Sequence, residues 1–161
     1  MALSRARCSL LFLKIVMADV YAFAGLFLAA FLAATLLPMQ SEAVLAGLVV
    51  AGGQPVPALL LVASLGNILG ATLNWALGRW LWQARDSRWF PASPGRLARA
   101  ELWYRRYGRW SLLLSWLPLI GDPLTLVAGL LREPLPVFLL LVSIGKIGRY
   151  LLVAQLALQA G

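Results

Sequence analysis

An aspartate lies between two prolines in an otherwise apolar run, WLPLIGDPLTLVAGL, at residues 116 to 130. The whole chain has six acidic residues, no histidine and a single cysteine, Cys8. The commonest general base is therefore missing, and a cysteine metal cluster or disulfide framework is excluded. We expect no enzyme activity, no cofactor and no metal site. A carboxylate in an apolar segment is instead typical of the polar sites of membrane transport proteins.

The composition is that of a membrane protein. Hydrophobic residues make up 61% of the 161 residues and charged residues only 12%, unlike the half-apolar, quarter-charged average of soluble proteins. Between Glu42 and Arg79 no residue is charged, and this stretch exceeds the roughly 20 apolar residues needed to cross a bilayer. The formal charge of +8 comes from arginines that flank apolar segments, which is a topology signal. We expect membrane lipids as partners, and no nucleic acid.

Two segments share a pattern that indicates an internal repeat. LLPMQSEAVLAGL at 36 to 48 and WLPLIGDPLTLVAGL at 116 to 130 both place an acid four residues after a Leu-Pro pair and before Ala-Gly-Leu. Each segment continues through two prolines to a similar apolar stretch, LLLVASLGNI or LLLVSIGKI. The acids in equivalent positions are Glu42 and Asp122.

Asp122 follows an apolar segment that is too short for a full crossing. Residues 110 to 121 span about 18 Å as a helix, which reaches the midplane of the bilayer but not its far side. The segment is either half of a re-entrant hairpin that turns near Pro118, Gly121 and Pro123, or part of one kinked span. The prolines and Gly121 favour the hairpin, whose turn must be surrounded by protein or a watery cavity.

The other repeat leaves two interpretations for its first segment. Val20 to Leu37 is uncharged and ends at Pro38, and it is either a nearly complete crossing or the first half of a matching hairpin. If each hairpin is followed by one crossing helix, the two hairpins enter from opposite faces. The expected fold is an all-α integral membrane protein with two inverted repeats, each a re-entrant helical hairpin followed by a transmembrane helix. An interfacial amphipathic helix lies between them, and Glu42 and Asp122 form one shared polar site.

The expected domain is a single membrane-embedded unit at 20–161, after an N-terminal extension at 1–19. The extension is open to interpretation as a signal peptide or as sequence upstream of a true start at Met17. Within the unit we expect hairpin 1 at 20–53, a transmembrane helix at 56–82, a basic interfacial segment at 83–109, hairpin 2 at 110–132 and a second transmembrane helix at 134–159.

Two cations lie deep in the last apolar segment. Lys146 and Arg149 are three residues apart in SIGKIGRYLL, on neighbouring positions of one helix face. Because a lone buried cation is costly, we expect Lys146 to pair with Glu42 or Asp122. Snorkelling to the membrane surface is the alternative for both side chains, and for Arg149 the sequence favours neither.

A ridge of small and polar residues runs along the first crossing helix. Gly66, Gly70, Asn74 and Gly78 recur every fourth residue, which lets another backbone approach closely. The approaching backbone belongs either to the same chain or to a second copy, so a homo-oligomer stays open. We expect Asn67 and Asn74 to support a hairpin tip as interhelical hydrogen-bond donors.

The arginines also predict orientation. Eight of them gather between Arg79 and Arg109, and the positive-inside rule places this loop, 79–109, in the cytoplasm. Both termini then lie outside if the first apolar segment is half of a hairpin. They lie on different sides if that segment is a full crossing.

In these features the chain resembles the DedA superfamily of SNARE-associated or VTT-domain membrane proteins, and in particular its YqaA-like branch. The resemblance covers about Met17 to Leu158. It rests on Pro38 with Glu42, the glycines and Arg79 in GNILGATLNWALGRW, WYRRYG at 103 to 108, Pro118, and Ala128-Gly129. It implies re-entrant hairpins packed on crossing helices, a bacterial inner (plasma) membrane location, and movement of a polyprenyl-phosphate carrier or phospholipid between leaflets, with a link to the proton gradient.

The chain departs from the family pattern at three positions. Many members have an Arg, aromatic, Pro, Arg pattern before the second tip, where this chain has Ser115 and Gly121 at the arginine positions. An acid that commonly follows the second glycine of the first crossing is replaced by Ala71. Headgroup recognition by those arginines is therefore not carried over, and only Glu42 and Arg79 are transferred from the family motif.

Three functions follow from these residues. In the leading hypothesis a lipid crosses between leaflets, with Glu42 and Asp122 as a polar gate or proton-linked switch and Lys146 and Arg79 as counter-ions or headgroup contacts. The alternatives are a proton-coupled small-solute transporter and a non-transporting membrane factor whose hairpins bind a partner.

Overall fold

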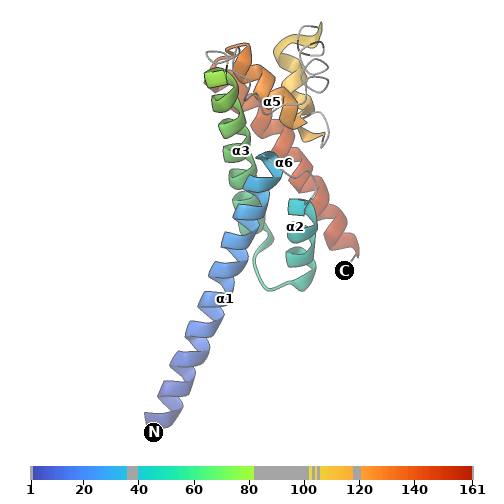
Figure 1. Ribbon diagram of the computed structural model, residues 1–161. Helices are drawn as coiled ribbons and strands as arrows, with labels where there is room; N and C mark the ends of the chain where they lie inside the picture. The colour runs from blue at the N-terminus through green and yellow to red at the C-terminus, as the bar shows by residue number, and fades with distance from the viewer. Residues whose placement is uncertain are drawn as a thin grey trace.

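The computed structural model describes residues 2–35, 40–81, 102, 104, 106–117 and 121–160, and this described part contains helices and no strand. The helices are α1 (Ala2–Thr35), α2 (Gln40–Ala51), α3 (Val56–Leu81), the 3₁₀ helix η1 (Gly108–Trp116), α5 (Gly121–Leu130) and α6 (Leu135–Ala160) (Figure 1). The all-α class expected from the sequence is confirmed. Most of the interfacial segment expected at 83–109 lies outside the described residues.

Three of these helices are long and apolar enough to cross a membrane. The candidate spans are Val16–Thr35 in α1, Val56–Trp80 in α3 and Leu135–Gln159 in α6, with 20, 25 and 25 residues. At about 1.5 Å per residue each reaches the thickness of the roughly 30 Å hydrocarbon core. Ser41–Ala51 in α2 is apolar but shorter. The chain is thus an integral membrane protein.

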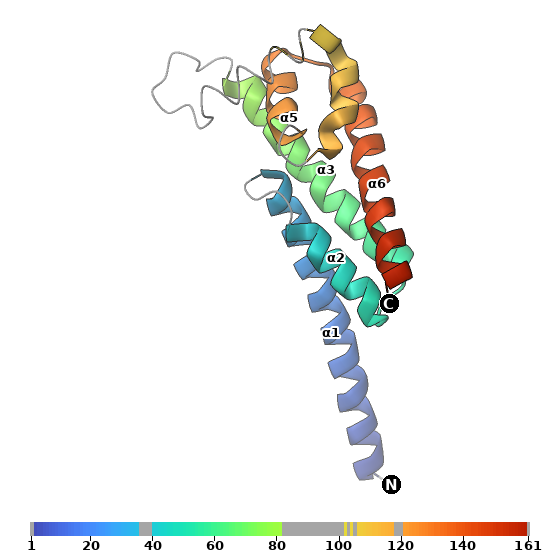
Figure 2. The same ribbon diagram turned by 90° about the vertical axis from the view of Figure 1, so that its right-hand side faces the viewer.

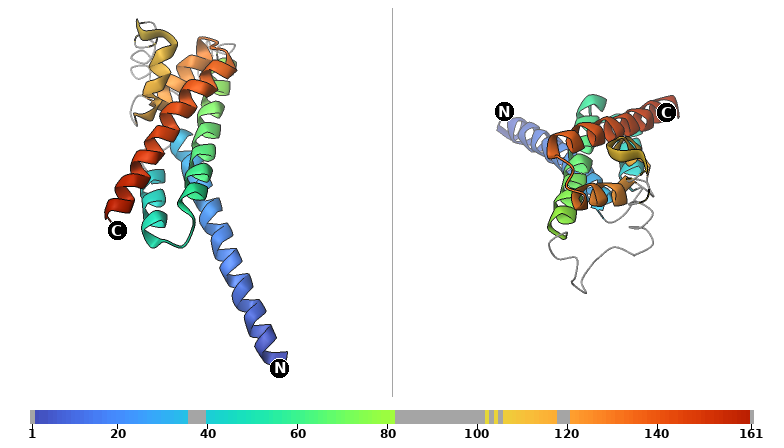
Figure 3. Two further views of the ribbon diagram at one scale, coloured as in Figure 1. Left: turned by 180° about the vertical axis from the view of Figure 1, so that it is seen from behind. Right: turned by 90° about the horizontal axis from the view of Figure 1, so that it is seen from above.

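Two antiparallel helix pairs approach each other from opposite ends of the molecule. α1 and α2 make the first helical hairpin, and η1 and α5 make the second (Figures 1 and 2). The long helices α3 and α6 run along both hairpins. The two hairpins meet near the middle of these long helices (Figure 2). The beginning of α1 extends away from the bundle, on the same side as the end of α6 (Figure 3).

The packing intertwines the two halves of the chain. α1 packs on α3, and η1 packs on α6. The second arm of each hairpin, however, contacts the long helix of the other half, because α5 packs mainly on α3, and α2 packs on α6 more than on α3. Each hairpin therefore packs on the long helices of both halves.

Glycines allow α3 to approach α1 closely. A Cβ atom added at Gly66 would lie 2.5 Å from the carbonyl oxygen of Phe27, and one added at Gly70 would lie 2.5 Å from that of Phe31. Any residue larger than glycine at either position would therefore clash with a carbonyl oxygen of α1.

A second close approach joins α3 to α5. A Cβ atom at Gly78 would overlap the carbonyl oxygen of Leu126, and one at Gly129 would overlap that of Trp75. The glycine ridge expected from the sequence thus packs within the chain, against two different helices.

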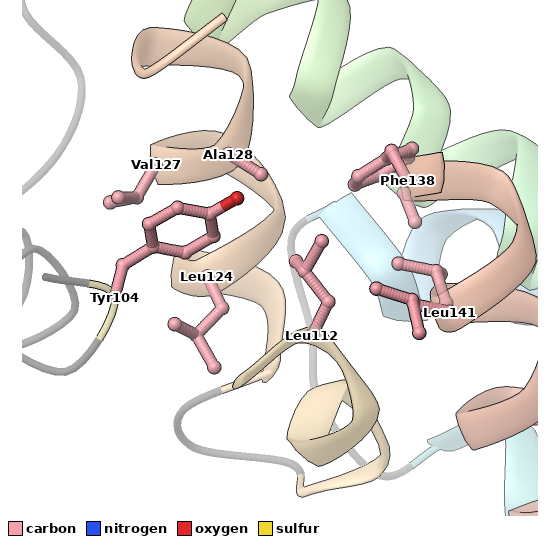
Figure 4. Close-up of a cluster of buried hydrophobic side chains, with 9 residues drawn as sticks. Tyr104, Leu112, Leu124, Val127, Ala128, Phe138 and Leu141 are labelled. Carbon is pink, nitrogen blue, oxygen red and sulfur yellow. The ribbon is translucent and has the colours of Figure 1, made fainter. Parts of the chain in front are cut away.

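Two clusters of buried apolar side chains hold these contacts. One joins α3, η1, α5 and α6, and Figure 4 shows several of its members around Tyr104 and Leu124. The other joins α1, α2, α3 and α6 and includes the ring of Tyr150. The members of the second cluster are Leu26, Ala30, Leu45, Val49, Leu59, Ala63, Tyr150 and Ala157.

A defined backbone motif turns α5 into α6. The Glu133 N–H donates to the Ala128 carbonyl at 2.9 Å, and the Arg132 N–H donates to the Gly129 carbonyl at 3.0 Å. Arg132 has a positive φ of 58°, so these bonds form a Schellman motif. This compact end of α5 lets residues 131–134 reverse the chain direction.

Candidate functional site

Glu42 and Asp122 each lie in the first turn of a short helix, α2 and α5 respectively. The first turn of a helix presents unpaired backbone N–H groups and the positive end of the helix dipole, which stabilise a nearby carboxylate. The two acids in equivalent positions of the sequence repeat are therefore placed in equivalent positions of the two hairpins.

Both acids form ion pairs with α6. Arg149 Nε pairs with Glu42 Oε1, and Lys146 Nζ lies 3.6 Å from Asp122 Oδ1. The side chain of Lys146 is only 3% exposed, so its charge depends on this partner. The structure thus joins Lys146 to Asp122, one of its two expected partners, and also pairs Arg149, for which the sequence favoured neither outcome.

A hydrogen-bonded chain continues from Lys146 across α3 to α2. Lys146 Nζ donates to Asn67 Oδ1, and Asn67 Nδ2 donates to the Tyr150 hydroxyl at 2.8 Å. The Tyr150 hydroxyl lies 3.0 Å from Ser41 Oγ. We call this set the polar cluster: Ser41, Glu42, Asn67, Asp122, Lys146, Arg149 and Tyr150.

Asn74 supports both hairpins two turns further along α3, on the same face as Asn67. Its Nδ2 donates to the Ala34 carbonyl at 2.8 Å, one of the last carbonyls of α1, which have no partner within that helix. The same nitrogen lies 3.4 Å from Thr125 Oγ1, and Thr125 donates to the Asp122 carbonyl at 2.7 Å. Asn67 and Asn74 therefore both donate interhelical hydrogen bonds.

Repeat-equivalent residues meet at the centre of the polar cluster. Asn67 follows Gly66 in α3 just as Lys146 follows Gly145 in α6, and the two side chains are bonded to each other. A Cβ atom at Gly145 would lie 3.0 Å from the Leu113 carbonyl oxygen of η1. Gly145 thus packs on the first arm of the second hairpin, as Gly66 packs on the first arm of the other.

The structure does not bring Arg79 to the polar cluster. Arg79 lies near the end of α3, about 18 Å along the helix from Asn67 at a rise of about 1.5 Å per residue. It is exposed, and its guanidinium lies 5.2 Å from the ring centroid of Trp75. Arg79 is therefore not a counter-ion of Glu42 or Asp122 here.

The turn residues expected from the sequence are only partly described. Gly121 begins α5, where a Cβ atom would overlap the Ser115 carbonyl oxygen, so the tight turn needs glycine. Pro123 lies in the first turn of α5, where its missing N–H removes no helical hydrogen bond. Pro38 and Pro118 lie outside the described residues.

Sequence reasoning missed Ser41 and Tyr150. Both are buried, with 3% and 1% exposure, and each is next to a residue that was recognised, Glu42 or Arg149. Adjacency in a helix does not predict a shared contact, since neighbouring residues point about 100° apart. Serine near the start of a helix, however, is a known signal for a polar role.

The chemical groups of the polar cluster are two carboxylates, two cations, an amide and two hydroxyls. They can bind a polar or charged group and exchange hydrogen-bond partners with it. Within the described residues, no three acidic, histidine or cysteine side chains gather closely enough to hold a metal ion.

Comparison with known proteins found a match to the VTT domain model over residues 37–158. The inner membrane protein YqaA of Escherichia coli (strain K12) is 38% identical over 143 residues, which cover 89% of this chain and 96% of that protein. An uncharacterized protein of Haemophilus influenzae is 36% identical over 132 residues, covering 78% of this chain and 80% of that protein. No solved structure matches the chain at comparable significance.

Proposed function

The chain belongs to the VTT-domain (DedA) family of membrane proteins, as its resemblance predicted, and on that basis we propose that it moves a lipid between the leaflets of a bacterial inner membrane. The headgroup crosses beside the polar cluster while the acyl or prenyl tails stay in the bilayer. This transport needs no covalent chemistry and no cofactor, and the partners are lipids and not nucleic acid.

The observation that carries this proposal is the meeting of two acidic helix ends on one face of α6. Glu42 and Asp122 arrive on separate hairpins and pair with cations three residues apart. Each charge at the centre of a transmembrane helix costs about 2.5 to 3.5 kcal/mol on insertion scales. Polar residues kept there despite this cost usually mark a transport pathway, and here they lie where the hairpins meet.

We further propose that both hairpins are re-entrant and inverted. Gln54, between α2 and α3, donates to Asp19 Oδ1 at 3.1 Å, and this polar contact suits the membrane surface. The apolar part of α1 from Val16 is long enough to cross, but with the membrane surface at Asp19 only about 24 Å of helix remains to Thr35 at a rise of about 1.5 Å per residue. This is less than a hydrocarbon core of roughly 30 Å. α1 then turns back inside the membrane, with loop 79–109 in the cytoplasm and both termini on the other side.

The test is lipid movement in vesicles that contain the purified protein. The vesicles carry a fluorescent phospholipid or polyprenyl phosphate, and a reagent added outside quenches the label that it can reach. The quenched fraction reports exchange between leaflets. Glu42→Gln and Asp122→Asn should each lower the rate about tenfold or more, because each leaves a cation without its carboxylate. The matched control is Asp19→Asn, which changes a carboxylate outside the polar cluster and should keep the rate of the unmodified protein.

Unchanged lipid movement in both Glu42→Gln and Asp122→Asn would remove these residues from the pathway. Uptake of a solute driven by a pH step, without lipid movement, would favour a proton-coupled solute transporter. If neither assay responds while a partner protein co-purifies, the hairpins serve a non-transporting membrane factor.

A further inference from the structure

Tyr150 of α6 contacts two helices of the other half of the chain, α2 and α3, through a single atom. Its hydroxyl lies 2.8 Å from Asn67 Nδ2 of α3 and 3.0 Å from Ser41 Oγ of α2. Its ring is packed in the apolar cluster with 1% exposure, so the hydroxyl has little freedom to move.

Hydrogen-bond chemistry gives this chain of contacts a single direction. An ammonium group can only donate, so Lys146 fixes the Asn67 amide with its oxygen toward Lys146 and its nitrogen toward Tyr150. Tyr150 accepts from that nitrogen and has one hydrogen of its own. Among the described contacts, Ser41 Oγ is the acceptor left for this hydrogen.

The two ends of this chain lie on different hairpins. At one end Lys146 pairs with Asp122 of α5, and at the other Ser41 precedes Glu42 in the first turn of α2. Two successive residues of α2 therefore dock on two successive residues of α6, as Ser41 meets Tyr150 and Glu42 meets Arg149. Asn67 bonds to both Lys146 and Tyr150, so it links the docking of α2 on α6 to the ion pair of Lys146 with Asp122 of the second hairpin.

We infer that Tyr150 is a positioning residue that couples the two hairpins, so that release of Asp122 from Lys146 loosens the docking of α2 on α6. Asp122 holds the ammonium of Lys146 beside Asn67. Without this carboxylate the buried ammonium moves toward water or another acceptor, and the Asn67 amide then loses the donor that fixes its orientation. Tyr150 then loses the hydrogen bond that it accepts from Asn67, and its own hydrogen bond with Ser41 is no longer held in one position. The inference rests on the proposed function for its purpose, because coupled hairpins would open one path and not two separate ones.

Hydrogen exchange of the full-length protein in lipid nanodiscs tests this coupling without any transport assay. Exchange of the α2 amides measures local opening of that helix. Asp122→Asn should raise it about fivefold or more, equivalent to a local destabilisation of about 1 kcal/mol. In a Tyr150→Phe background the same Asp122→Asn change should add no further increase, because the link is already cut.

Two further variants guard against an effect of Tyr150→Phe on folding. Ser41→Ala cuts the other end of the link and keeps the tyrosine, and it should also abolish the response of α2 to Asp122→Asn. Tyr104→Phe removes another buried hydroxyl, which donates to Glu133 Oε2 at 2.6 Å outside the polar cluster. It should leave the response intact.

The inference is overturned if Asp122→Asn leaves α2 exchange unchanged, or if it raises exchange equally with and without the Tyr150 hydroxyl. If the coupling is present while the vesicles show no lipid movement, the inference stands and the proposed function fails. The converse result, lipid movement that depends on both acids without coupled exchange, leaves the proposed function and removes the link through Tyr150.

Discussion

The buried ammonium of Lys146 contacts side chains of two other helices, the Asp122 carboxylate of α5 and the Asn67 amide of α3. Arg149, three residues further along α6, is more exposed, at 19%, and pairs with Glu42. The two ion pairs are therefore not equivalent in solvation. Losing the carboxylate next to Lys146 should be the more damaging change, since less water can replace it.

Removing one partner of the Lys146–Asp122 pair should destabilise the protein more than removing both. Asp122→Asn leaves a buried charge without a counter-ion, a change that typically costs about 3 to 5 kcal/mol. Combining it with Lys146→Met removes the charge and keeps a side chain of similar length. We expect the double variant to recover at least about 1 kcal/mol in thermal unfolding monitored in detergent. A double variant less stable than the single one would mean that Lys146 stabilises the fold even without Asp122, through its bond to Asn67.

Close backbone contacts join the helices in addition to the polar groups. α3 contacts the backbone of α1 at Gly66 and Gly70, and that of α5 at Gly78. In a membrane, association of helices relies on such packing because lipid is as apolar as the side chains. α2 and α5, the second arms of the hairpins, pack on the long helix of the other half. Glu42 and Asp122 lie on these two arms, so this packing also positions the polar cluster.

Gly129→Ala should destabilise the protein, because its methyl group would overlap the Trp75 carbonyl oxygen. Overpacking of this kind typically costs about 1 to 3 kcal/mol, and backbone cannot move aside as a flexible side chain can. Gly47→Ala in α2 is the matched control, since no atom lies within 4 Å of its added Cβ. Thermal unfolding should show a lower Tm for the first variant and an unchanged or higher Tm for the second. Equal effects would contradict the close contact of α3 with α5.

At the level of the whole molecule, the hairpins enter from opposite ends and the first and last helices start and finish on one side (Figures 1 and 3). The linker between α5 and α6 is therefore at the opposite end from the linker between α2 and α3. This arrangement makes a direct prediction about which residues are reached from which face of the membrane.

Single cysteines in a Cys8→Ser background should report this arrangement in intact cells. Arg109→Cys and Arg132→Cys flank the second hairpin and should react with a membrane-impermeant reagent from the same face, the cytoplasmic one. Gly53→Cys, between α2 and α3, should react only from the opposite face. Labelling of positions 109 and 132 from different faces would instead establish that the segment between them crosses the membrane.

Much of this protein was predictable from its sequence. Membrane embedding follows from the length of the uncharged stretches, and helical structure follows because a chain in lipid must satisfy its own backbone. The repeat pattern singled out Glu42 and Asp122, the cost of a buried cation singled out Lys146, and the family resemblance is confirmed by the comparisons. All of these are properties of composition and spacing, which can be read along the chain.

Only the tertiary structure decided which residues meet. In the structure the second arm of each hairpin packs on the long helix of the other half, and Arg149 pairs with Glu42. Ser41 and Tyr150 join the polar cluster, whereas Arg79 lies away from it near the end of α3. These outcomes depend on how each helix is rotated about its axis. A helix that is apolar all round, as membrane helices are, carries no hydrophobic stripe to specify that rotation, and here it is specified by close contacts at glycines and by pairs of polar side chains.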